Sequence, residues 1–242
     1  MDYLKEFTSK IQSLDRSKRL FTVFKDFLIL STSAIAQPFY KSDKIEQRYL
    51  ETIKTYTKEQ ANEFSQLLAL LVNALEEKHQ DFLGQVYMRL NLGNSANGQF
   101  FTPYHVSKLM SKINFAETEN LLKNKSFITL SEPCCGSGGI IIAFAETMKD
   151  SGYNYQNQLY VEAIDIDELC FMMTYLQLSL YGIPARVIHG DTISYRYQQD
   201  LLTPFYFING FSWRLKEIEQ SETKSQQEII KKAVEMKQLS LF

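Results

Sequence analysis

The sequence has few cysteines, little net charge and no long apolar run. Its three cysteines, Cys134, Cys135 and Cys170, cannot build a disulfide framework and show no metal-ligand spacing with the three histidines. The formal net charge of -2 is unlike that of a strongly basic nucleic-acid binder. No run of ~18 uncharged apolar residues occurs, and the first residues lack the basic-then-apolar layout of a secretion signal. We therefore expect a cytoplasmic protein without a membrane span.

Glycine and proline are also scarce, with 10 and 5 copies, and their placement divides the chain. Residues 1–92 hold only Pro38 and Gly84 of these two types, and their leucines recur at helical spacing. We expect four or five helices, which form a helical N-terminal region over 1–95. Breaks between them are expected near residues 14–15, 37–38 and 57–58.

Short apolar strands alternate with apolar helices in the second half of the chain. Strands are expected at 127–130, 158–164 and 185–188, and helices at 103–113, 140–148 and 168–181. Thr102 is expected to cap the helix that starts at Pro103. The repeated strand–loop–helix units indicate an α/β protein with a Rossmann-like parallel sheet and right-handed crossovers. This core spans 96–212, and a C-terminal region over 213–242 contains a polar helix at 217–236.

A residue type suited to cofactor binding follows each of the three strands. A glycine turn over 136–139 follows the first strand, Asp165 ends the second and Asp191 follows the third. The carboxyl ends of parallel strands share the edge of the sheet at which ligands bind. Glycines let a ligand approach the backbone, and an acid after the second strand can accept both ribose hydroxyls. Each feature alone could be a tight turn, a helix cap or a solvated carboxylate, but their order favours a nucleoside cofactor.

Four short segments occur in a fixed order around these residues. They read GQFFTP at 98–103, EPCCGSGG at 132–139, IDID at 164–167 and GDT at 190–192. Together they resemble the adenine-specific DNA methyltransferases of the type I restriction-modification M-subunit group. That family writes its cofactor loop as Asp-Pro-x-Cys-Gly-Ser-Gly-Gly, and Glu132 replaces the Asp here. The resemblance implies the class I S-adenosylmethionine-dependent methyltransferase fold.

The resemblance also implies an S-adenosyl-L-methionine site. Thr102 would hold the methionine end of the cofactor. The amino-acid part would be lined by Glu132, Gly136, Ser137 and Gly138.

The nucleoside end of the implied site lies on the second and third loops. Asp165 would bind the ribose, Ile166 would pack on the adenine and Asp191 would bind the adenine amine. Cys134 and Cys135 are interpreted as loop packing, because no adjacent histidine supplies a base for a nucleophilic thiol.

The family's catalytic tetrapeptide, Asn or Asp-Pro-Pro-Phe or Tyr, is missing from the sequence. Such a loop accepts the hydrogens of the adenine amine and stacks on the flipped base, which makes that amine nucleophilic. Weak substitutes lie in a run of uncertain form: Pro204, Phe205, Tyr206 and Asn209. Two hypotheses remain open. The chain is a DNA adenine N6-methyltransferase with a divergent loop, or it is a non-catalytic DNA-transaction or regulatory protein.

The last five residues resemble the pentapeptide that docks bacterial proteins on the replication sliding clamp. Leu241 and Phe242 would fill an apolar pocket, Leu239 a shallower one, and Gln238 would bind at the rim. The alternative is an apolar tail folded onto its own domain. A clamp tether, or a partner subunit, would supply the DNA localisation that this acidic chain lacks.

Overall fold

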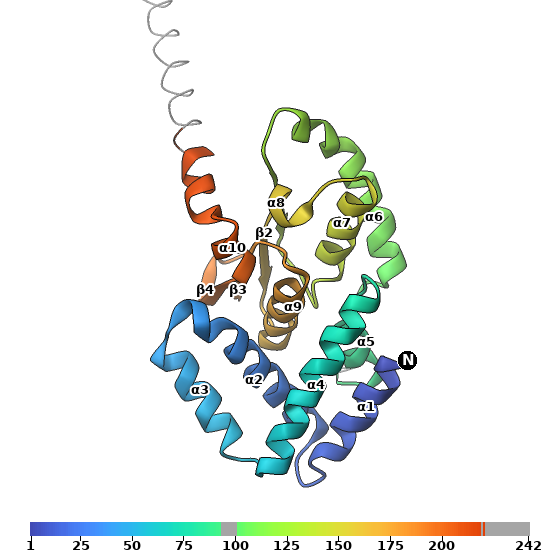
Figure 1. Ribbon diagram of the computed structural model, residues 1–242, viewed down its shortest axis with the longest axis vertical. Coiled ribbons are helices and arrows are strands. Elements are labelled where there is room, and N and C mark those ends of the chain that lie inside the picture. The colour runs from blue at the N-terminus through green and yellow to red at the C-terminus, as the bar shows by residue number, and fades with distance from the viewer. Residues whose placement is uncertain (93–100, 219, 221–242) are drawn as a thin grey trace, which may run out of the picture.

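The computed structural model of the protein describes residues 1–92, 101–218 and 220 (Figure 1). Its first part is helical, as the sequence predicts. The helices are α1 (Tyr3–Leu14), α2 (Leu20–Tyr40), α3 (Asp43–Ile53), α4 (Lys58–Glu77) and α5 (Phe82–Arg89). The break expected at Pro38 is wrong, because Pro38 lies in the last turn of α2 and the left-handed Lys41 ends that helix. The breaks after Leu14 and before Lys58 are confirmed.

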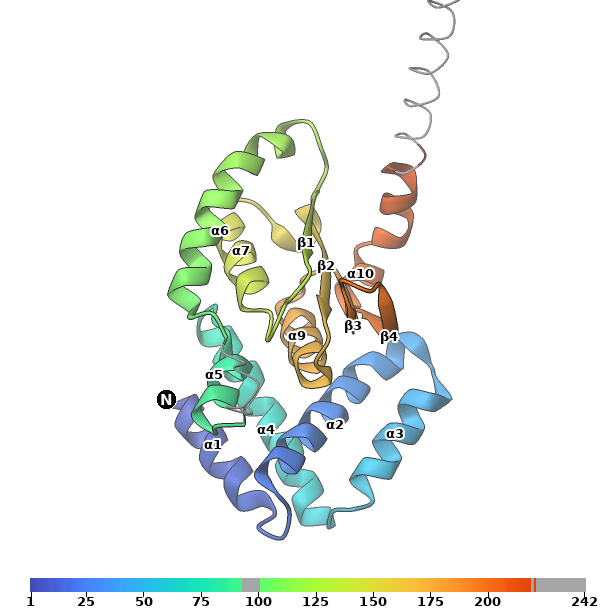
Figure 2. The same ribbon diagram turned by 180° about the vertical axis from the view of Figure 1, so that it is seen from behind.

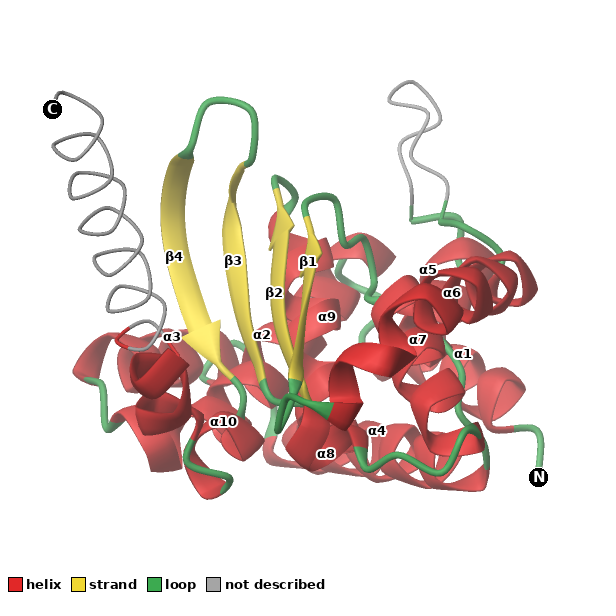
Figure 3. Ribbon diagram, turned by 90° about the horizontal axis from the view of Figure 1, so that it is seen from above, coloured by secondary structure: helices red, strands yellow, loops and turns green. Residues whose placement is uncertain are grey.

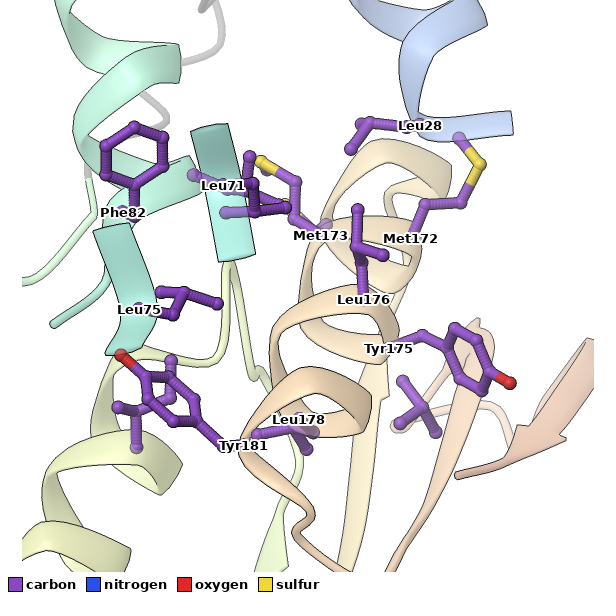
Figure 4. Close-up of a cluster of buried hydrophobic side chains, with 14 of the residues drawn as sticks. Leu28, Leu71, Leu75, Phe82, Met172, Met173, Tyr175, Leu176, Leu178 and Tyr181 are labelled. Carbon is purple, nitrogen blue, oxygen red and sulfur yellow. The ribbon is translucent and has the colours of Figure 1, made fainter. Parts of the chain in front are cut away.

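Helix α2 is a core helix. Its side chains Phe24, Phe27 and Leu28 are fully buried. By length and composition α2 could also cross a membrane, but 56% of its most apolar window is buried inside the fold. Figure 4 shows Leu28 beside Met172 of α9 (Glu168–Tyr181), the helix against which α2 packs.

The second part of the chain is an α/β unit, which confirms the predicted class. Its sheet has the order β1-β2-β3-β4. The strands are β1 (Ile128–Glu132), β2 (Leu159–Asp165), β3 (Ala185–Asp191) and β4 (Arg196–Leu202). The first three strands are parallel, and they are joined through α7 (Gly139–Asp150), the short α8 (Tyr155–Gln158) and α9. Figure 3 shows α9 lying along one face of this sheet.

Strand β4 is antiparallel to β3, which the sequence pattern did not predict. A bulge falls between His189 and Gly190 on β3. Any Cβ on Gly190 would meet the Tyr197 ring at 2.5 Å, so glycine permits this close pairing. The polar sequence of β4 hides its strand character, because an edge strand needs apolar residues on one face only.

The face of the sheet away from α9 carries ion pairs and an aromatic cluster of Tyr160, Tyr206 and Phe211. Leu159, Val161 and Ala163 of β2 are fully buried, whereas the alternate residue Glu162 is partly exposed. The Arg186 guanidinium lies 3.6 Å from Glu162 and 2.8 Å from Asp200. This alternation marks a sheet that is covered mainly on one side.

Helix α6 (Tyr104–Thr118) precedes the sheet and packs on α7, and the 3-10 turn η1 (Glu119–Lys123) follows it. Pro103, rather than the expected Thr102, takes the N-cap position, and no side chain caps the helix. Glu146 of α7 accepts hydrogen bonds from the Tyr104 hydroxyl and the Lys108 ammonium, both at 2.8 Å. After β4 come α10 (Pro204–Ile208) and a helical stretch over 211–218. Most of the helix predicted at 217–236 lies outside the described residues.

Candidate functional site

The loops after β1 and β2 are joined through Asp165, the last residue of β2. The backbone amide of Gly136, after β1, donates a hydrogen bond to Oδ2 of Asp165 at 2.8 Å. The amide of Asp167 donates to Oδ1 at 2.9 Å. Since a carboxylate has about four acceptor positions, each oxygen can accept one more donor. Asp165 therefore orders the glycine turn and can still bind a pair of hydroxyls.

The glycine turn depends on backbone conformations that favour glycine. Gly136 has φ 56° and Gly138 has φ 90°. A Cβ on Gly136 would stand 3.1 Å from the Phe101 ring, and one on Gly138 would stand 3.2 Å from Oγ1 of Thr174. Gly138 is also the N-cap of α7, so the first amides of that helix face the turn. The glycines thus bring backbone donors close to the space beside Asp165.

The loop after β3 is tied to the other two loops. The Thr192 hydroxyl donates to the Pro133 carbonyl at 2.6 Å. Nε2 of His189 lies 3.1 Å from the Ile166 carbonyl oxygen. Together with the Gly136–Asp165 bond, these contacts hold the loops after β1, β2 and β3 next to one another. The order of the motifs along the sequence predicts this arrangement.

Asp191 is engaged within its own turn. It accepts hydrogen bonds from the Ile193 amide at 2.9 Å and from the Ser194 hydroxyl at 2.8 Å. The bonds from Ser194, Ile193 and the Ser194 amide hold the pKa of the Asp191 carboxyl below its ordinary value. The neighbouring Ile166 is 66% exposed and offers an open apolar face at this edge.

A pocket of about 250 Å³ opens at the β1 and β2 loops. Four residues predicted for cofactor binding line it: Thr102, Gly136, Ser137 and Asp165. The other predicted residues lie around it rather than in its lining: Glu132, Gly138, Ile166 and Asp191. Glu132 accepts a hydrogen bond from the Cys134 amide at 3.3 Å, so it shapes the turn.

Burial controls the acids and thiols of this pocket. Desolvation raises the pKa of the Asp165 carboxyl, although two backbone amides act against that rise. Burial also raises the pKa of the Cys135 thiol, which disfavours the thiolate. The exposed Cys134 has a free thiol. The structure supports a packing role for Cys135.

Sequence reasoning missed Asp81, a fully buried acid that supports the glycine turn from the helical region. Asp81 caps α5 through the Gly84 amide and accepts a hydrogen bond from the Ser137 hydroxyl at 2.5 Å. Nε2 of Gln177 on α9 donates to Asp81 at 2.9 Å and to the Ser137 carbonyl at 2.7 Å. Desolvation raises the pKa of the Asp81 carboxyl. The only signal in the sequence is an Asp placed before a helix, which also fits an ordinary cap.

The weak catalytic candidates Pro204, Phe205, Tyr206 and Asn209 do not reach this edge. They follow Leu202, which pairs with Arg186 at the start of β3, whereas the cofactor loops follow the ends of β1, β2 and β3.

Local contacts confirm this placement at the amino ends of the strands. The Asn209 side-chain amide donates to the Gln156 carbonyl at 2.6 Å, and the Tyr206 ring packs 6.1 Å from that of Tyr160 near the start of β2. In the described structure these weak candidates therefore lie away from the cofactor loops. The antiparallel course of β4 carries the chain away from the cofactor edge.

The predicted clamp-binding residues Gln238, Leu239, Leu241 and Phe242 lie outside the described residues. They stay a prediction from the sequence.

A family model matches the larger part of the chain. Residues 78–230 match the family model described as N-6 DNA Methylase. Among curated proteins, none matches the sequence. A solved Listeria monocytogenes protein assigned to the class I S-adenosylmethionine-dependent methyltransferases is similar at 14% identity and a TM-score of 0.37. The similarity covers 78% of this chain and 55% of that protein, so the chain spans about half of its length.

Proposed function

The chain belongs to the N-6 DNA methylase family, and we propose that it binds S-adenosyl-L-methionine at the edge formed by the β1, β2 and β3 loops. The observation that carries the proposal is the hydrogen bond between the Gly136 amide and Asp165, which places an acid with spare acceptor positions beside an open backbone turn. A cofactor with a ribose diol and a charged amino-acid end needs both features.

The residues present fit this cofactor. Asp165 would accept the ribose hydroxyls, and the exposed Ile166 would pack on the adenine. Thr102, Ser137 and the backbone around Gly136 would hold the amino-acid end, because they line the pocket. When bound, the cofactor supplies an activated methyl group. The residues of this chain orient it and exclude water from the buried side of the pocket.

The position of Asp191 refines the proposal. Its carboxylate already accepts hydrogen bonds from Ile193 and Ser194 in the turn after β3. A bond from the adenine amine would therefore use a remaining acceptor position. We assign Asp191 to loop positioning as well as to adenine recognition.

Calorimetric titration with S-adenosyl-L-methionine tests the proposal. We expect a measurable heat, and Asp165→Ala should weaken affinity ~10- to 100-fold because two ribose hydroxyls lose their acceptor. Asp200→Ala is the matched control, since this acid lies on β4 away from the pocket. A folded protein that gives no heat, or equal affinity in both variants, would refute the assignment.

The reaction proposed for the family site is N6-methylation of adenine in DNA. These 242 residues do not contain the amine-activating tetrapeptide. The nearest substitute follows Leu202, at the amino ends of the parallel strands and away from the cofactor loops. We therefore propose that the chain binds the cofactor but needs a further component to methylate DNA. A type I M-subunit-like role with a partner subunit fits this division.

The second candidate function is a non-catalytic DNA-transaction or regulatory protein tethered to the sliding clamp. The missing tetrapeptide and the terminal residues Gln238–Leu239–Ser240–Leu241–Phe242 favour it. The two functions are separated by whether any added component restores methyl transfer.

A further inference from the structure

Strand β1 runs into the glycine turn of the cofactor site, yet it is an outermost strand of the described sheet. Within the residues that the structure describes, β1 pairs with β2 alone, and no strand lies along its second edge. Doubly wound sheets continue on both sides of their first strand and bind ligands where the strand order reverses. The described sheet therefore corresponds to one half of a doubly wound sheet. Its cofactor loops follow the carboxyl ends of the strands, next to the unpaired side of β1.

The two edges of the sheet differ in their protection. The β4 edge carries the exposed polar residues Arg196, Gln198 and Asp200, as solvent-facing edges usually do. The β1 edge has no charge from Ile128 to Ser131, and Thr129 and Ser131 are exposed. An uncharged edge of this kind is suited to pairing with another strand.

Helix α6 carries an exposed apolar stripe. Its members are Val106, Leu109, Met110 and Ile113, which are 37–61% exposed. Their spacing of three and four residues places them on one side of the helix. The buried Ser107, Ser111 and Phe115 lie on the opposite side, towards α7. The stripe is therefore an apolar face that α7 does not cover.

A groove of about 320 Å³ lies along β1 and reaches the end of α6. Its lining includes Asn114 and Glu117 of α6, Ile128 and Leu130 of β1, and Ile218. Figure 2 shows β1 in view between α6 and the orange helical stretch that follows α10. Met110 and Ile113 of the stripe lie one helical turn before the groove residues Asn114 and Glu117. We name the strand edge, the groove and the stripe together the β1–α6 surface.

We propose that the β1–α6 surface docks a polypeptide from outside these 242 residues that adds a strand parallel to β1 and carries an Asn/Asp-Pro-Pro-aromatic loop. This inference rests on the proposed methyltransferase function. Parallel strands end at the same edge, so that loop would meet the pocket beside Asp165.

The remaining residues of the sequence do not fit this occupant. Residues 221–242 contain no proline and hence no Pro-Pro loop. They are also shorter than the ~30 residues of a strand–helix–strand unit. A second copy of the chain brings no such loop either.

The test adds, in trans, fragments of N-6 DNA methylases that begin just before the strand leading to their Asn-Pro-Pro-aromatic loop. We expect the full chain to bind one or more of them, and binding to slow hydrogen exchange of the β1 amides. Ile113→Glu should weaken binding at least about tenfold, because it puts a charge into the apolar contact. Ile208→Glu is the matched control, since Ile208 is similarly exposed (63%) but lies on α10.

Other outcomes overturn the inference. If no fragment binds, or if β1 amides exchange equally in free and mixed samples, the surface is not a docking site for such a strand. A dimer of this chain that Ile113→Glu dissociates would assign the surface to a second copy. Slow β1 exchange that becomes fast when 221–242 are removed would assign it to this chain's own tail. Cofactor titration is run separately, so loss of cofactor binding with retained fragment binding would refute the proposed function and leave the docking surface standing.

Discussion

Asp81 and Ser137, which are 56 residues apart in sequence, share a buried hydrogen bond that joins the helical region to the cofactor turn. Asp81 belongs to the start of α5 and Ser137 to the loop between β1 and α7. Gln177 of α9 contacts both residues, so three separate elements meet at one carboxyl group. The helical region therefore positions the cofactor loop as well as covering the sheet.

Replacing Asp81 should show this coupling. Asp81→Ala leaves the buried Ser137, Gln177 and Gly84 donors without their acceptor, so we expect a loss of roughly 3–5 kcal/mol in unfolding free energy and weaker cofactor binding. Asp81→Asn keeps an acceptor and should stay close to wild type at low pH, where the Asp81 carboxyl is protonated in the folded protein. Chemical denaturation measures the stability, and equal stability of the Ala and wild-type proteins would contradict the role.

The stability difference between Asp81→Asn and the wild-type protein should depend on pH. Burial raises the pKa of Asp81 in the folded state, so the native protein holds its proton at pH values where the unfolded chain has lost it. The stability contributed by Asp81 therefore falls as pH rises from its ordinary value through the raised one. We expect the stability of Asp81→Asn relative to wild type to increase as pH rises above 3.8, the ordinary pKa of the carboxyl. A difference that is flat with pH would contradict the raised pKa.

Two glycine substitutions separate backbone strain from site geometry. Gly136 (φ 56°) and Gly152 (φ 86°) both have positive φ, but only Gly136 would bring a Cβ against Phe101. Each change to Ala should cost about 1–2 kcal/mol of stability. Only Gly136→Ala should also weaken cofactor affinity, by about tenfold, since the Phe101 ring lines the pocket. Equal cofactor affinities in the two variants would show that the turn does not contact the cofactor.

The isolated chain should methylate DNA weakly or not at all. The reason is that the sequence contains no Asn/Asp-Pro-Pro-aromatic tetrapeptide, and its nearest substitute follows β4 at the amino ends of the parallel strands. Incubation with labelled cofactor and mixed-sequence DNA measures the activity, and the assay is repeated in lysate to supply partner subunits. Robust incorporation into adenine by the purified chain would mean that another residue activates the amine.

Truncation after Lys237 should abolish binding to the bacterial sliding clamp and leave cofactor affinity unchanged. A short peptide that buries little area binds at roughly micromolar strength, with most of the energy in Leu241 and Phe242. A pull-down with purified clamp measures binding, and a thermal melt follows stability. A lower melting temperature without any clamp binding would instead mean that the tail packs on its own domain.

Local patterns in the sequence determined the helices, the three parallel strands and the residues that follow them. Helical spacing with a single glycine, Gly84, predicts the helices before Leu92. The turn over 136–139 and Asp165 identify the cofactor edge. These features depend on interactions within a few residues or on the general geometry of parallel sheets, and both can be recognised in a linear pattern.

Tertiary structure decided the direction of β4, the role of Asp81 and the open edge of β1. The polar sequence of β4 does not indicate whether the strand runs parallel or antiparallel to β3. The observed antiparallel pairing places the segment after Leu202 away from the cofactor loops. In the sequence Asp81 is indistinguishable from an ordinary helix cap. Only the fold shows that it is buried against Ser137 and Gln177. Each of these outcomes depends on contacts between residues far apart in the chain, and no local pattern encodes which distant partner a residue will meet.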